Sequence, residues 1–82
     1  MLKIKDNINL KELEKFGFIN GYFNLMRKNT NEDDICWNET FIDKNTRIIY
    51  ERLEPCGNSI FEIDKENKYI QDLIQSGLVE KV

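Results

Sequence analysis

The segment CWNETFIDKNTRIIYERL, residues 36–53, gives the clearest indication of the fold. Two stretches rich in aromatic and β-branched residues, 36–42 and 47–53, flank the polar tetrapeptide DKNT. Asp is favoured at the start of a turn, and Asn tolerates the left-handed backbone conformation that tight turns need. The segment therefore predicts a β-hairpin with Asn45 in the left-handed position.

Helix signals lie on both sides of this hairpin. Asn9 and Glu12 form a capping-box pattern, and Gly17 stands where a left-handed residue commonly ends a helix. These residues predict an α-helix over 9–16. A stripe of apolar residues at helical spacing predicts a second α-helix over 67–76.

The remaining stretches are typical of strands, which we expect over 2–5, 18–26, 60–64 and 78–82. The element order is then β-α-β-β-β-β-α-β. It indicates a single α+β domain over 1–82, with a small antiparallel β-sheet and two α-helices packed on one face. We expect the middle strands to form a meander and the terminal strands to lie side by side. The aromatic residues of the middle strands are expected mostly in the core, except where an uncovered sheet face presents them as a contact surface: Tyr22, Phe23, Phe41, Tyr50 and Phe61.

Size and charge narrow the possible functions. The chain has 82 residues, with 12 Lys and Arg against 15 Asp and Glu, for a net charge of −3. This balance disfavours direct nucleic-acid binding, which depends on neutralising phosphates. No run of about 18 apolar residues is present, so we expect no membrane segment. Residues 1–6 are not followed by an apolar stretch, so we also expect no signal peptide and a cytoplasmic location.

The residue types required for catalysis are scarce. The chain contains no histidine, which removes the usual general base and the commonest metal ligand. Cys36 and Cys56 then lack a partner for nucleophilic catalysis and form an incomplete set of metal ligands. We therefore expect no enzymatic activity, no cofactor and no metal site.

One acidic segment is the strongest candidate for a contact surface. Glu32, Asp33 and Asp34 are consecutive acids, and Trp37 and Glu39 follow closely. An acidic surface with an exposed Trp as its anchor fits a basic partner protein. Two alternatives stay open at this point: the acids form a solvated loop, or Trp37 is a core residue.

Several stretches together resemble small uncharacterised proteins from phages and prophages of low-GC Gram-positive bacteria. They are LKIKD at 2–6, LKELEKFGF at 10–18, IDKNTR at 42–47, YIQDLI at 69–74 and GLVEKV at 77–82. The resemblance implies a host-cell context, in which such proteins often bind a host protein. Inhibitors of CRISPR–Cas and other defence systems are one large class of these, so the implied partner is a nucleic-acid-handling defence effector.

Three functional hypotheses follow. The leading one is a non-enzymatic protein that binds a host protein, with Glu32, Asp33, Asp34, Trp37 and Glu39 at its contact face. The second is a protein that sequesters a small signalling molecule at an oligomer interface, in a pocket that includes Tyr50 and Arg52. The third is a structural protein that self-associates through a sheet edge or a helix face.

The acidic segment gives a first prediction. Replacing Glu32, Asp33 and Asp34 together with Lys should weaken partner binding, because the reversed charges repel a basic surface. The melting temperature should stay unchanged. Partner capture and thermal unfolding of the triple variant measure the two effects, and undiminished capture would contradict the assignment.

Overall fold

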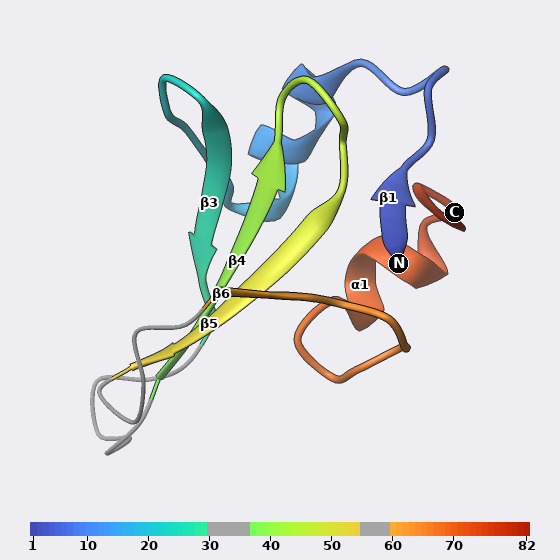
Figure 1. Cartoon of the computed structure of the whole chain (residues 1–82). Coiled ribbons are helices and arrows are strands. Elements are labelled where there is room, and N and C mark those ends of the chain that lie inside the picture. Colours follow the sequence, from blue (N-terminus) through green and yellow to red (C-terminus); the bar gives the residue numbers. More distant parts are fainter. Residues whose placement is uncertain (30–36, 55–59) are drawn as a thin grey trace.

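Backbone hydrogen bonds organise the chain into strands and two short helices in the computed structural model, which describes residues 1–29, 37–54 and 60–82 (Figure 1). The described residues form seven strands, one 3₁₀ helix (η1) and one α-helix. In chain order these elements are β1 (Leu2–Ile4), η1 (Leu10–Phe16), β2 (Ile19–Asn20), β3 (Asn24–Lys28), β4 (Trp37–Asp43), β5 (Ile49–Glu54), β6 (Ile60–Glu62), α1 (Gln71–Gln75) and β7 (Val79–Lys81).

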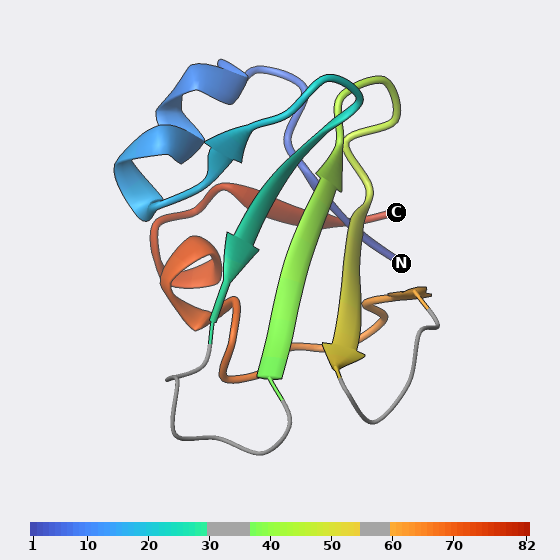
Figure 2. The same cartoon turned by 90° about the vertical axis from the view of Figure 1, so that its left-hand side faces the viewer.

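The strands form two antiparallel sheets. The larger sheet has the order β2-β3-β4-β5-β6, and β1 pairs with β7 in the smaller one. The Leu2 N–H donates to the Ile63 carbonyl at 2.9 Å, and the Ile4 N–H donates to the Arg47 carbonyl at 2.9 Å, so β1 is joined to the larger sheet. Figure 2 views that sheet face-on, with β3, β4 and β5 in front and the β1–β7 pair behind them.

The predicted hairpin and the pairing of the terminal strands are both confirmed. β4 and β5 pair in antiparallel register from Trp37 opposite Glu54 to Ile42 opposite Ile49. The left-handed residue of the turn, however, is Arg47 (φ 66°) and not Asn45. Its guanidinium donates to the carbonyls of two residues of the segment that connects β1 to η1, and these bonds hold the unusual backbone in place.

The predicted α+β arrangement with two α-helices on one face is wrong. The fold is mostly β, because the segment 9–16 forms a 3₁₀ helix and the α-helix covers only Gln71–Gln75. Asn9 caps η1 and Gly17 ends it at φ 90°, as predicted, but seven residues are too few to stabilise an α-helix by themselves. Before α1, the Asn67 side chain accepts hydrogen bonds from the next residues' N–H groups, and this turn delays the start of the helix. Within the described residues, no helix has the length and apolar character needed to cross a membrane.

A small apolar core lies between the larger sheet, the β1–β7 pair and the two helices. On the strands, Leu25, Ile42 and Ile49 are at most 2% exposed, and the helices add Leu13 and Leu73. Along the strands of the larger sheet, residues alternate between the core and the outer sheet face, as the pleat requires. The buried apolar residues are Leu2, Ile4, Leu13, Phe18, Leu25, Ile42, Ile49, Ile63, Ile70 and Leu73.

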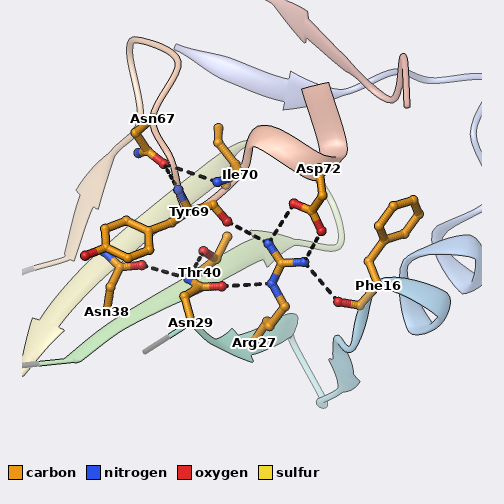
Figure 3. Close-up of polar contacts among 9 residues, drawn as sticks. All are labelled: Phe16, Arg27, Asn29, Asn38, Thr40, Asn67, Tyr69, Ile70 and Asp72. Atoms are coloured by element: carbon orange, nitrogen blue, oxygen red, sulfur yellow. Dashed lines mark hydrogen bonds and ion pairs between the residues drawn. The ribbon is translucent and has the colours of Figure 1, made fainter. Parts of the chain in front are cut away.

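Arg27 on β3 joins the sheet to both helices (Figure 3). Its guanidinium donates to the Phe16 carbonyl at the end of η1 (2.9 Å) and to the Tyr69 carbonyl before α1 (2.7 Å). It also binds both carboxylate oxygens of Asp72, at 2.7 and 3.1 Å, and the Asn29 amide oxygen at 2.8 Å. One guanidinium group therefore binds acceptors in or next to β3, η1 and α1. The bidentate pairing with Asp72 fixes its orientation.

The polar network continues across the inner face of the sheet. The Asn29 amide donates to Asn38 (2.7 Å) and to the Thr40 hydroxyl, and the Asn38 amide donates to Glu51 (3.0 Å). Asn38 and Thr40 are at most 1% exposed, yet no buried side-chain nitrogen or oxygen of the described residues lacks a partner. The buried polar groups are thus fully hydrogen-bonded, which removes most of their desolvation cost.

The Arg27 contacts give a stability prediction. Arg27→Met should lower the free energy of unfolding by about 2–4 kcal/mol, because it leaves Asp72 and two carbonyls without their donor. Denaturant unfolding measures the loss, with Lys11→Met as a control that removes an exposed cation from η1. Equal stabilities of the two variants would show that the network contributes little.

Candidate functional site

The outer face of the larger sheet carries the candidate site. In Figure 1, α1 and β1 lie on one side of β3, β4 and β5, and no described residue covers the other side. The strand register sets Met26 beside Phe41, Phe41 beside Tyr50, and Tyr50 beside Glu62 on this face. Met26, Phe41 and Tyr50 therefore form an apolar and aromatic row across β3, β4 and β5, and the row ends at Glu62 on β6.

A hollow of about 480 Å³ lies along this row. Phe41, Tyr50 and Ile60 supply its apolar walls, and Arg52 lies at the Ile60 end because those two residues are cross-strand neighbours. Asn24 and Asp43, which face each other across β3 and β4, lie at the opposite end. The hollow is thus an aromatic surface with polar groups at both ends.

Glu39 holds Arg52 in place. Oε1 of Glu39 accepts from Nε of Arg52 at 3.2 Å and from Nη2 at 2.7 Å. The guanidinium lies 5.2 Å from the centre of the Phe41 ring, in cation–π contact. Because Glu39 is only 7% exposed, its carboxylate serves mainly to orient and neutralise Arg52.

Asp43 is a fixed negative charge at the other end. Its Oδ1 accepts from the N–H groups of Asn45 (2.7 Å) and Thr46 (2.9 Å). These bonds hold the pKa of the Asp43 carboxyl below its ordinary value of 3.8, and the bond from Thr46 has the larger effect. The carboxylate therefore stays ionised at neutral and mildly acidic pH.

Two aromatic side chains project from the turn next to this end of the hollow. Tyr22 is 88% exposed and Phe23 is 76% exposed. Their rings contact each other edge to face with centroids 4.6 Å apart. The Lys44 N–H donates to the Phe23 carbonyl at 3.2 Å, which joins this turn to the β4–β5 turn (Figure 2).

Gly21 makes this β2–β3 turn possible. Its N–H donates to the Asn24 carbonyl at 2.9 Å, and a Cβ at this position would lie 2.7 Å from that same oxygen. The expected single strand over 18–26 is therefore split, and Tyr22 and Phe23 lie at its tip and not in the core. The prediction of a strand over 18–26 did not take account of Gly21, which is the signal that could have indicated this turn.

The predicted contact residues are placed only in part. Glu32, Asp33 and Asp34 lie outside the described residues, as do Cys36 and Cys56. Trp37 begins β4, where its backbone pairs with Glu54, but its side chain is outside the description. Glu39 lies on the outer face, where it is 7% exposed and pairs with Arg52. The acidic contact face stays a prediction.

Comparisons with known proteins add no candidate activity: no protein-family model, curated protein or solved structure matches this chain. Among the described residues, no group of three or more Cys, Asp or Glu side chains could hold a metal ion. The described geometry supports a contact surface. We call it the aromatic surface and define it as Tyr22, Phe23, Asn24, Phe41, Asp43, Tyr50, Arg52 and Ile60.

Asp43 gives a pH-dependent prediction. Because its folded-state pKa is lowered, its charge stabilises the fold above about pH 4, and this contribution is lost as the pH falls through the folded-state value. Asp43→Asn keeps the Oδ1 acceptor but removes the charge. We expect the variant to melt a few degrees below the native protein at pH 7, with the difference shrinking and then vanishing as the pH falls through the lowered folded-state pKa of Asp43. A difference that is constant over this range would contradict the assignment.

Proposed function

We propose that this protein acts without catalysis, by binding another protein through the aromatic surface. The observation that carries the proposal is the exposure of Tyr22 and Phe23, 88% and 76%, at the tip of a hairpin. Exposure of two adjacent aromatic rings to water is unfavourable in free energy. Burying such a ring in an interface contributes about 2–4 kcal/mol to the binding free energy. Aromatic anchors of this kind dominate the affinity of many protein interfaces.

The rest of the surface supports the same function. The hollow beside the tip offers further apolar area from Phe41, Tyr50 and Ile60, and its charged groups are held in fixed positions by Glu39 and by the β4–β5 turn. Fixed side chains lose little conformational entropy on binding, which favours affinity. An apolar centre with polar groups at its ends is the usual composition of a protein interface.

We propose a host protein as the target, in keeping with the resemblance to small phage proteins. A nucleic-acid-handling defence effector, such as a CRISPR–Cas nuclease, is the first target to test. Binding would inhibit it by covering a functional surface and not by chemical modification. The net charge of −3 suits a partner with basic surfaces.

The second candidate function is sequestration of a small signalling molecule. Tyr50 and Arg52, the residues expected to line such a pocket, do lie in the same hollow. A ligand that binds only the folded protein raises its melting temperature, and the increase grows with the logarithm of the ligand concentration once this exceeds the Kd. Stabilisation by small molecules of a host extract, with no protein captured, would favour this second function.

The tip residues provide the decisive test. Tyr22→Ser combined with Phe23→Ser should reduce capture of the target by about tenfold or more, because it removes both anchors. The melting temperature should not fall, since neither ring packs against the core. Phe61→Ser is the matched control: Phe61 is 54% exposed and alternates to the other side of β6 from Ile60.

Quantitative pull-down from host lysate and thermal unfolding measure both properties. Capture of the same protein in equal amount by the double variant would overturn the aromatic surface as the contact. In that case the acidic segment around Asp33 is the next surface to vary.

A further inference from the structure

The hollow on the aromatic surface has the chemistry to receive one particular kind of side chain. We infer that it binds an arginine or lysine side chain of the partner protein, with the aliphatic stem on the aromatic wall and the cationic group at the Asp43 end. This inference rests on the proposed protein-binding function and names the partner's chemistry.

The wall of the hollow suits the stem of a long basic side chain. Phe41 and Tyr50 are cross-strand neighbours, and Ile60 borders the same hollow. Aromatic faces attract cations through their quadrupole, and arginine stacks on them readily. The resident Arg52 already makes this contact with Phe41, so the partner's cationic group is directed past Tyr50 toward the Asp43 end of the hollow.

Asp43 and Asn24 supply acceptors at the turn end of the hollow. Both backbone donors of the turn use Oδ1 of Asp43. An ionised carboxylate has about four acceptor positions, so it retains capacity for a charge-assisted hydrogen bond. The side chain is already oriented by the turn, which limits the entropy lost when a ligand binds.

The balance of charge selects a cation over an anion. Arg52 is the one cation among the six residues that line the hollow, and Glu39 pairs with it at 2.7 Å. Asp43 makes no ion pair with a described residue within 4.0 Å. Together these three side chains carry a net charge of −1, so an acidic group would meet an unbalanced carboxylate.

Two amino-acid probes test the inference directly. N-acetyl-arginine amide carries the cation, and N-acetyl-citrulline amide is its neutral isostere. In an NMR titration of the full chain, we expect the arginine probe to shift the ring signals of Phe41 and Tyr50 and to bind at least about fivefold more tightly than the citrulline probe.

Variants locate the interaction. Asp43→Asn should lower the affinity for the arginine probe by about fivefold, because the hydrogen bonds within the turn are kept and only the charge is lost. Glu66→Gln removes an exposed charge from the segment before α1 and should leave the affinity unchanged. Equal affinity of the two probes, or no shift of Phe41 and Tyr50 up to the solubility limit, would overturn the inference.

The inference and the proposed function fail in distinguishable ways. Tyr22→Ser with Phe23→Ser should reduce partner capture by about tenfold or more but leave the arginine probe bound. If this double variant loses the partner while Asp43→Asn captures it fully, the proposed function stands and the basic side chain is excluded. If the double variant keeps the partner but Asp43→Asn loses both partner and probe, the hollow and not the tip is the contact.

Discussion

The fold depends on one guanidinium group. Arg27 extends from β3 to the end of η1 and to α1, and its five donors meet the acceptors that these elements leave open. Two helices of seven and five residues have too few internal hydrogen bonds to persist alone. The contacts of Arg27 compensate for this shortness, so the helices stay on the inner side of the sheet.

This arrangement assigns different tasks to the two faces of the sheet. The inner face is occupied by the core and by the polar network that begins at Arg27, which leaves the outer face without a covering layer of described residues. The functional proposal follows from this asymmetry. Exposed aromatic rings on a monomer are unusual unless they meet a partner, and here they lie together beside a hollow with fixed charges.

The sequence predicted the central hairpin, the pairing of the terminal strands and both ends of the first helical segment. It did not predict the helix types or the orientation of β4. In that strand Phe41 was expected mostly in the core, and whether Trp37 belongs to the core was left open. The structure buries Asn38 and Thr40 instead, because Asn29 and Glu51 from neighbouring strands satisfy their polar groups. These partners are distant in sequence, so no local pattern identified them.

By itself, the sequence determined what depends on neighbouring residues: the turn at Asp43, the end of the first helical segment at Gly17 and the alternation of the strands. Alternation defines two faces of a strand but not which of them is covered. Only the tertiary structure decided that, because burial depends on which distant side chains supply hydrogen-bond partners and apolar contacts. The inner face carries both the core residues Leu25, Ile42 and Ile49 and the polar network that begins at Arg27. Phe41 and Tyr50 therefore lie on the outer face, where they line the candidate site.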